Sequence, residues 1–139
     1  MRIREAMSTN VKVISPDDSI EEAANIMRES DCGVLPVGKD HHLLGVITDR
    51  DIVVRAVALG KQPQNCTVAD VMTPGVEYVY EDESAETAAD NMSRLQIRRL
   101  PVLDHQKRLV GIVTLGDLAV RHDCSTASVA LRCISEPSA

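Results

Sequence analysis

The chain has 139 residues and a net charge of −6, a length that suits one compact domain or two small halves sharing a core. It contains no Phe, no Trp and only two Tyr, so its core must be built from aliphatic side chains. The negative charge argues against nucleic acid or an anionic membrane as partner, and the lack of both a signal peptide and an apolar run of roughly 18 residues indicates a soluble, cytoplasmic protein.

The first half of the chain predicts the element order β-α-β-β-α. A short strand is expected at 11–14, and a polar turn then leads to Ser19 and Glu22, which have the spacing of a capping box at the start of a helix. That helix has one apolar stripe at the spacing i, i+3, i+4, i+7, formed by Ile20, Ala23, Ala24 and Met27. Two further strands and a helix follow at 34–37, 43–48 and 49–59.

The second half repeats this pattern. Residues 7–37 align with 72–102 at an offset of 65, and the offset becomes 66 from Leu43 onward. A long period that occurs only twice indicates two similar half-units around one core rather than a solenoid. The strands and the last helix of the second half are expected at 76–80, 100–103, 109–114 and 116–122, and its first helix has the stripe Ala85, Ala88, Ala89 and Met92.

The repeat also predicts the domain boundaries and an α/β (α+β) fold. Both repeats begin with a short helical turn, and the tail, which has no counterpart in the first repeat, predicts a short helix at 125–134 with Val129, Ala130 and Ile134 on one side. The expected division is repeat 1 at 1–59, a linker at 60–66, repeat 2 at 67–122 and the tail at 123–139.

Each repeat ends in the same turn, written GVITDRDIVVR in the first and GIVTLGDLAVR in the second. A buried strand ends at Thr48 or Thr114, and Asp51 or Asp117 follows one turn into the next helix. The free N–H groups at a helix start suit a phosphate, the hydroxyl can donate to it, and the carboxylate can accept from ribose hydroxyls. The same spacing is also that of a capping box, which is favourable without any ligand. Capping and nucleotide binding are compatible.

Together these features resemble a tandem pair of CBS domains, also called a Bateman module. The resemblance rests on the internal repeat, the lead-in before each copy, the LPV strand and the doubled turn, and it covers residues 1–122. With its tail, the chain is similar to the small stand-alone CBS proteins of the hypoxic-response type. The resemblance implies two β-α-β-β-α halves related by a pseudo-twofold axis, adenosine-containing ligands in the clefts between the halves, and a homodimer.

The resemblance assigns ligand-binding roles to the repeated turn and to a basic pair. Asp51 and Asp117 would hold a ribose, with Thr48 and Thr114 near the ribose and the phosphates. Arg98 and Arg99, which precede the LPV strand of repeat 2, would reach phosphates, a task that suits the planar guanidinium group. A solvated basic pair is the alternative interpretation.

The two repeats differ at these positions. Repeat 1 has Gly33 and Val34 where repeat 2 has its arginine pair, and it has Arg50 within TDRD where repeat 2 has Gly116 within TLGD. Since these residues would decide affinity for phosphate, we expect two unequal clefts, with Arg50 as a candidate ligand-binding residue in the first.

A non-catalytic regulatory protein is the function that these features favour. It would bind an adenosine-containing small molecule such as AMP, ADP or ATP, require no cofactor or metal, and regulate a protein that the sequence does not identify. One alternative is a structural or interaction dimer with no physiological nucleotide. Another is a small nucleotide hydrolase, which would need a base or metal cluster that no motif supplies.

The aromatic and histidine residues have competing interpretations. Tyr78 and Tyr80 alternate along a strand and share one face, where they either fill the core or stack on an adenine. His41 and His42 lie in a polar turn, which predicts a surface loop rather than a metal site.

The cysteines and two glycines carry structural expectations. The cysteines lack the spacing of zinc ligands and are expected to be free thiols, with a disulfide through Cys133 as the alternative. Gly45 and Gly111 interrupt the second strand of each repeat, and we expect them to permit close approach of another backbone segment. The cysteines are Cys32, Cys66, Cys124 and Cys133.

Overall fold

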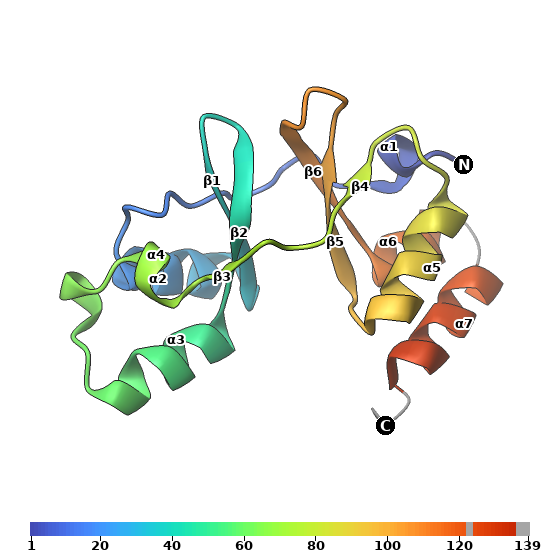
Figure 1. The fold of residues 1–139 in the computed structure, drawn as a ribbon. Helices are drawn as coiled ribbons and strands as arrows, with labels where there is room; N and C mark the ends of the chain where they lie inside the picture. Colours follow the sequence, from blue (N-terminus) through green and yellow to red (C-terminus); the bar gives the residue numbers. More distant parts are fainter. Residues whose placement is uncertain (122–123, 136–139) are drawn as a thin grey trace. The chain divides into compact units, whose positions relative to one another are not determined.

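The computed structural model describes residues 1–121 and 124–135, and it consists of two compact units (Figure 1). Unit 1 is formed by residues 1–11 together with the chain from 77 onward, and unit 2 is the continuous segment 12–76. Each unit combines helices with one three-stranded sheet, which confirms the expected mixed α/β (α+β) class.

Unit 2 holds the first repeat from residue 12 onward, together with the lead-in of the second repeat. Its sheet has the order β1-β2-β3, and both neighbouring pairs are antiparallel. Beside β1, Ile14 forms a single parallel bridge to Val37, so the strand expected at 11–14 is reduced to one residue. The elements are α2 (Ile20–Ser30), β1 (Val34–Lys39), β2 (His42–Thr48), α3 (Asp49–Arg55), η1 (Val57–Leu59), η2 (Pro63–Asn65), α4 (Val68–Val71) and β3 (Thr73–Pro74).

Unit 1 has the same topology. Strand β4 runs parallel to β5, β5 runs antiparallel to β6, and Ser8 bridges Ile112 beside β6. The C-terminal helix α7, which confirms the helix expected in the tail, packs against α5 and α6. The elements are α1 (Ile3–Ala6), β4 (Val79–Tyr80), α5 (Ala85–Leu95), β5 (Arg99–Leu103), β6 (Leu109–Thr114), α6 (Leu115–Arg121) and α7 (Cys124–Ser135).

The first long helix of each repeat begins and ends in the same way. The Ser19 hydroxyl accepts the Glu22 N–H at 3.2 Å at the start of α2, and the Ser84 hydroxyl accepts the N–H of the third helical residue of α5 at 3.1 Å. Both helices end in a residue with left-handed backbone, Asp31 at φ 50° and Gln96 at φ 56°. The left-handed residue at the end of each helix sets the direction of the chain that continues into β1 or β5.

The lead-in segments are exchanged between the two units. Helix α1 begins the first repeat in the chain, yet Ile3 and Ala6 are fully buried in the core of unit 1. Helix α4 begins the second repeat, yet Val68 and Val71 are fully buried in the core of unit 2. The repeats along the chain and the compact units in space are therefore different divisions of this protein.

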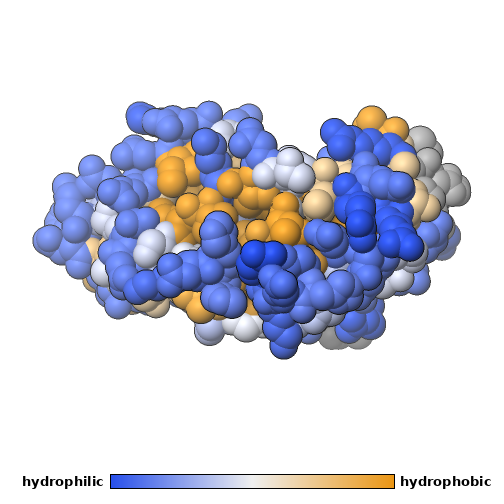
Figure 2. Space-filling model, turned by 90° about the horizontal axis from the view of Figure 1, so that it is seen from above, coloured by the Kyte–Doolittle hydropathy of each residue, from blue (hydrophilic) through white to orange (hydrophobic). Residues whose placement is uncertain are grey.

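Both cores are aliphatic, as the composition requires. Isoleucine, leucine, valine, alanine and methionine form nearly all of the buried positions in either unit. Polar residues make up most of the surface seen in Figure 2, with apolar side chains exposed between them. Across residues 1–121 and 124–135, every helix is too short or too polar to cross a membrane.

Three expectations about single elements are wrong in detail. The strand expected at 76–80 is limited to Val79–Tyr80, because these are the two residues that pair with β5. Val79 is buried in the core, whereas Tyr78 and Tyr80 are half-buried. Core burial of the two tyrosines is therefore incorrect. The helix expected at 49–59 breaks at Ala56, whose backbone leaves the helical region at φ −126°, and continues as the short η1.

Some of the expectations for the tail fall outside the described side chains. Ala130 is fully buried against the core of unit 1, and Ile134 packs beside it, as the predicted apolar side of this helix requires. The side chains of Val129, Cys124 and Cys133 are not among those described, so the disulfide through Cys133 stays an open expectation. Cys66 is a free thiol, and the Cys32 thiol donates a hydrogen bond to the Val34 carbonyl oxygen at 3.1 Å.

The contacts around Gly45 confirm that another backbone segment approaches this glycine closely, as predicted. A Cβ atom at Gly45 would collide with the Thr73 carbonyl oxygen and lie 2.8 Å from Met72 Cε. Because strand β3 is hydrogen-bonded there, we expect Gly45→Ala to lower the free energy of unfolding by roughly 1–3 kcal/mol. Urea unfolding followed by circular dichroism measures this change.

Gly116→Ala is the matched control. A Cβ atom at Gly116 would lie 3.6 Å from Thr114 Oγ1, an ordinary contact, and alanine favours the helix by about 0.5–1 kcal/mol. This variant should be as stable as the parent or more so. Equal urea midpoints for Gly45→Ala and the parent would show that the sheet does not need a glycine at this position.

Candidate functional site

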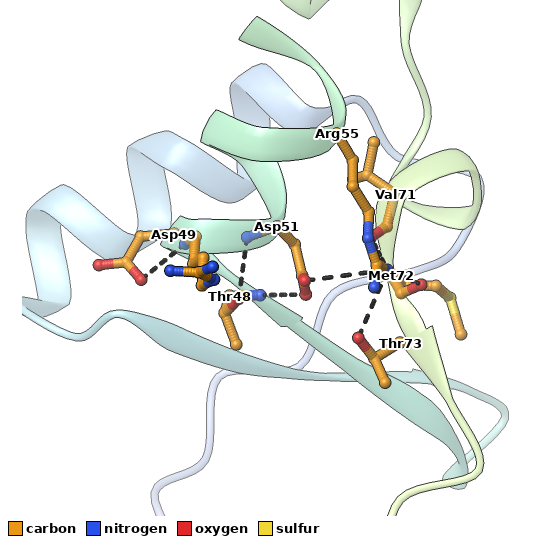
Figure 3. A network of polar contacts seen from close by, with 8 residues as sticks. Thr48, Asp49, Asp51, Arg55, Val71, Met72 and Thr73 are labelled. Carbon is orange, nitrogen blue, oxygen red and sulfur yellow. Dashed lines mark hydrogen bonds and ion pairs between the residues drawn. The ribbon is translucent and has the colours of Figure 1, made fainter. Parts of the chain in front are cut away.

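The turn between β2 and α3 is held by two reciprocal hydrogen bonds (Figure 3). The Asp51 N–H donates to Thr48 Oγ1 at 3.0 Å, and the Thr48 N–H donates to Asp51 Oδ2 at 3.0 Å. This is the capping box that the spacing predicts. The Thr48 hydroxyl proton is not used as a donor in this pair, so it can still be given to a ligand.

The second carboxylate oxygen of Asp51 faces an arginine. Asp51 is only 9% exposed, and its Oδ1 atom lies 3.8 Å from Arg55 Nη1. The same guanidinium nitrogen donates to the carbonyl oxygens of Val71 at 3.0 Å and Met72 at 3.1 Å (Figure 3). These carbonyls belong to the end of α4, where helical acceptors lack partners. Arg55 therefore links the β2–α3 turn to the end of α4, the lead-in segment that completes the core of unit 2.

The turn between β6 and α6 repeats the capping box in unit 1. The Asp117 N–H donates to Thr114 Oγ1 at 3.0 Å, and the Thr114 N–H donates to Asp117 Oδ2 at 3.0 Å. Asp117 is half-buried and Arg121 is exposed. Capping is thus confirmed at both turns, and each turn leaves one carboxylate oxygen outside the cap.

The basic pair of repeat 2 lies beside its turn. Arg99 is the register partner of Thr114 across the β5–β6 hairpin, and the Arg98 carbonyl accepts the Leu115 N–H at 2.9 Å. Both arginine residues are exposed. The structure therefore brings Arg98 and Arg99 to the edge of unit 1 that carries Thr114 and Asp117.

The corresponding edge of unit 2 has different chemistry. The Gly33 carbonyl accepts the Asp49 N–H at 2.9 Å, and the Asp49 carboxylate fills the space where a Gly33 side chain would lie, at 2.8 Å from its Cβ position. Arg50 is exposed at the helix start next to this acidic group, where its N–H donates to Asp49 Oδ1 at 2.8 Å. One turn is thus flanked by two arginines and the other by an aspartate and one arginine.

A third Thr-x-x-Asp sequence shows what the spacing alone can indicate. At the start of α4, the Asp70 carboxylate accepts the Thr67 N–H at 3.1 Å, and this bond lowers the pKa of Asp70. Thr67 does not end a long strand, so the pair only caps a helix. The hollow beside it, of about 380 Å³, is lined by Lys61, Gln62, Asn65, Cys66 and Asp70.

The sequence analysis missed a clamp between two loops of unit 1. His105, at the tip of the β5–β6 hairpin, contacts Asp82 Oδ2 through Nε2 at 2.6 Å, and its ring stacks on Tyr80 at 5.2 Å between centroids. Tyr78 meets Tyr80 edge-on at 5.6 Å. The hydrogen bond raises the pKa of His105 and lowers the pKa of Asp82.

Unit 2 has the same clamp with a lysine. Lys39 Nζ lies 3.4 Å from Asp17 Oδ2, and Asp17 is the counterpart of Asp82 in the repeat. The repeated aspartate, together with a basic residue at each hairpin tip, was the signal that could have revealed both clamps. His41 is exposed in the β1–β2 turn, as predicted, whereas His42 is exposed as the first residue of β2. Among the described residues, no group of three metal-binding side chains occurs.

Comparison with known proteins gives the same family for both repeats. The sequence model of the CBS domain matches residues 3–57 and 68–121. The CBS domain-containing protein YhcV of Bacillus subtilis is 42% identical over 118 residues, which cover 85% of this chain and 83% of that protein. Its similarity therefore extends over nearly the whole of both chains.

Two solved structures share the fold. A crystal structure of hypoxic response protein I with two coordinated zinc ions has a TM-score of 0.78 at 37% identity, covering 88% of this chain and 98% of that one. The CBS domain pair of protein MJ0100, crystallised with 5′-methylthioadenosine and S-adenosyl-L-methionine, has a TM-score of 0.73 at 33% identity, covering 86% and 98%. The expected resemblance to hypoxic-response-type proteins is thereby confirmed.

The clamp of His105 and Asp82 predicts a pH-dependent stability. Because folding raises the His105 pKa above its ordinary 6.5, the stabilisation is complete below that pH and is lost as the pH rises through the raised value. Because folding lowers the Asp82 pKa below 3.8, the stabilisation is also lost as the pH falls through the lowered value. We expect His105→Gln to lower the melting temperature more at pH 5.5 than at pH 8.5.

His41→Gln, in the exposed turn of unit 2, is the control for loss of a surface histidine. Its melting temperature should differ from the parent by the same small amount at both pH values. Differential scanning calorimetry measures both variants. If His105→Gln lowers the melting temperature equally at the two pH values, the His105–Asp82 pair does not stabilise the fold through its charges.

Proposed function

Since the chain belongs to the CBS domain family, with two CBS domains in tandem, we propose that it is a non-catalytic regulatory protein that binds an adenosine-containing ligand. One observation carries this proposal. In both units a strand with only two buried residues, rather than the fully buried strand that its apolar sequence predicts, ends in a threonine whose capping aspartate keeps one carboxylate oxygen outside the cap. A related CBS pair was crystallised with two adenosyl compounds, which supports this ligand class.

The proposed contacts follow from the chemistry of the two turns. The carboxylate oxygen of Asp51 or Asp117 that lies outside the cap accepts hydrogen bonds from ribose hydroxyls, and the threonine hydroxyl donates to the ligand. In unit 1, Arg98 and Arg99 add positive charge for phosphates. In unit 2, the Asp49 carboxylate beside Arg50 opposes phosphate, and Arg55 is engaged by Asp51 and the end of α4, so unit 1 is the better site for a charged nucleotide.

We extend the proposal to a homodimer that regulates another protein. Several large apolar side chains are exposed on α3 and η1 of unit 2, and an apolar surface of this kind favours association with another protein surface. They are Val53 at 56%, Val54 at 48%, Val57 at 59% and Leu59 at 67%. Light scattering that gave the mass of one chain, 15.1 kDa, at micromolar concentration would contradict the dimer.

The capping aspartates provide the first test of ligand binding. We expect AMP or ATP to raise the melting temperature of the parent, because a ligand that binds only the folded state stabilises it. Asp51→Asn and Asp117→Asn keep an oxygen for the cap but remove the charge. Each should weaken binding at its own turn by roughly tenfold to a hundredfold, the value of a charged hydrogen bond. Isothermal titration calorimetry measures the affinities.

Asp70→Asn is the matched control, because Asp70 caps α4 with the same geometry but does not follow a long strand. It should bind each nucleotide as the parent does. Wild-type affinity in both Asp51→Asn and Asp117→Asn would mean that the two turns are helix caps only. An absence of binding to the parent across AMP, ADP, ATP and S-adenosylmethionine would favour an interaction module without a nucleotide.

The arginine pair provides a separate test of phosphate recognition. The double variant Arg98→Ala/Arg99→Ala removes two cations and leaves the aspartates in place. Its affinity for ATP and ADP should fall by roughly tenfold or more, while its affinity for adenosine changes little. The salt dependence of ATP binding should also flatten, because a screened attraction has been removed. Calorimetry at two salt concentrations measures both effects.

Arg4→Ala/Arg94→Ala removes two exposed arginines from the same unit and controls for net charge. It should reduce ATP binding much less than the Arg98→Ala/Arg99→Ala variant. An equal loss of ATP and adenosine affinity in the latter would contradict phosphate recognition and would indicate that strand β5 had been disturbed.

A further inference from the structure

Arg55 joins the ligand turn of unit 2 to a second segment of the chain. Its Nη1 atom donates to the carbonyl oxygens of Val71 at 3.0 Å and Met72 at 3.1 Å (Figure 3). The same nitrogen lies 3.8 Å from Asp51 Oδ1, the carboxylate oxygen that lies outside the cap. One guanidinium group thus contacts both the proposed ribose acceptor and the segment 71–74, which we call the α4–β3 junction.

The α4–β3 junction has short strand pairing of its own. Strand β3 consists of Thr73 and Pro74, whose register partners in β2 are Val46 and Gly45. Thr73 is half-buried and Pro74 is exposed. A short element of this kind opens at a low free-energy cost compared with the core of a domain. The bonds from Arg55 therefore stabilise the docked junction where its strand pairing is weakest.

Asp51 depends on the same arginine because its carboxylate is nearly buried. The residue is 9% exposed, and its Oδ2 atom already accepts the Thr48 N–H. A nearly buried charge is stable only beside a compensating charge or hydrogen-bond donors. The 3.8 Å contact of Arg55 with Oδ1 is an ion pair without a hydrogen bond, so Oδ1 can still accept ribose hydroxyls.

The second repeat supplies a comparison for this contact. Arg121 is the counterpart of Arg55, and it follows Asp117 at the same spacing. It is exposed, and between Arg121 and the described residues of α1 there is no hydrogen bond. The link between a ligand turn and the end of a lead-in helix is therefore a feature of unit 2.

We propose that Arg55 is a positioning residue that couples ribose binding at Asp51 to the docking of the α4–β3 junction. This inference rests on the proposed function and adds how the ligand turn of unit 2 is regulated. The carbonyls of the docked junction hold Arg55 beside Asp51, so the docked form binds a ribose better than the open form. Coupling of this kind is reciprocal, and the bound ligand therefore stabilises the docked junction.

The position of the junction in the chain gives this coupling a direction. Strand β3 ends at Pro74, and unit 2 ends at Val76. The junction is thus the last part of unit 2 before the chain enters unit 1. A ligand at the Asp51 turn acts on the segment that connects the two units.

Selectivity for ribose hydroxyls tests the positioning role. The experiment uses the full chain with Asp117→Asn, so that a preference for ribose hydroxyls reports on Asp51. We expect adenosine to bind roughly tenfold more tightly than 2′,3′-dideoxyadenosine, the value of a hydrogen bond to a charged acceptor. Arg55→Gln should remove most of this preference, because affinity falls for adenosine and changes little for the dideoxy compound. Isothermal titration calorimetry measures the affinities.

Hydrogen exchange tests the coupling to the junction. Saturating adenosine should slow amide exchange in the peptide that covers residues 71–76 by roughly fivefold or more. The dideoxy compound should slow this exchange less, because it cannot donate ribose hydroxyls to Asp51. In the Arg55→Gln variant, saturating adenosine should leave the exchange unchanged. Mass spectrometry of the exchanged peptides measures these rates.

Two further variants complete the design. Arg121→Gln, also combined with Asp117→Asn, is the matched control, because it removes the equivalent arginine of unit 1. It should change neither the ribose preference nor the exchange of residues 71–76. Arg55→Lys keeps a cation that can reach the same carbonyls, so it should retain part of both effects. Circular dichroism checks folding, and Arg55→Lys tests the same expectations if Arg55→Gln is unfolded.

The outcomes distinguish the coupling from the proposed function. A wild-type chain that binds neither adenosine compound contradicts the proposed function and the coupling together. An equal loss of affinity for both compounds in Arg55→Gln overturns the positioning role, because it shows that the arginine only stabilises the fold. A clear ribose preference without any slowing of exchange at residues 71–76 overturns the coupling alone.

Discussion

The exchange of lead-in segments is the constraint on which the rest of the fold depends. A repeat of this size whose buried core has no aromatic side chain has few large groups with which to close that core. Ile3 and Ala6 close the core of unit 1, and Val68 and Val71 close that of unit 2. Each lead-in also lies beside the sheet of the unit it enters, at Gly111 and Gly45, where a side chain would prevent the contact. Neither repeat completes a core from its own residues.

Much of each unit could be predicted from local patterns. The stripe at Ile20, Ala23 and Met27, the serine cap before it and the LPV strands all act within a few residues, so periodicity and cap chemistry identify them. The exchange of lead-ins could not be predicted in this way, because α1 and α4 match each other and their apolar residues fit either core equally well. The tyrosines show the same limit, since alternation places them on one face without indicating whether that face is covered.

The sequence was enough to predict the Thr–Asp pair at each turn, but not the contacts that surround the pair. The strand end before Thr48 and Thr114 distinguishes them from Thr67, and that distinction depends on long-range strand pairing rather than on spacing. The contact of Arg55 with the end of α4 joins segments 16 residues or more apart in the chain, and no short motif marks it. The turns of the two units differ in their surroundings at the equivalent positions Gly33 and Arg98. The capping box is the same in both repeats, whereas the charge around it is different.

The discontinuous composition of unit 1 has a consequence for biosynthesis. Residues 12–76 leave the ribosome as one uninterrupted segment, so unit 2 can complete its core while the second half of the chain is still being translated. Residues 1–11 emerge before that segment, yet their partners in unit 1 begin only at residue 77 and include Ala130. Residues 1–11 thus wait for segments that are translated after unit 2, and unit 1 is the later of the two to fold. A nascent chain stalled between the repeats would carry a finished unit 2 and an exposed, unpaired α1, which is the form that chaperones would meet.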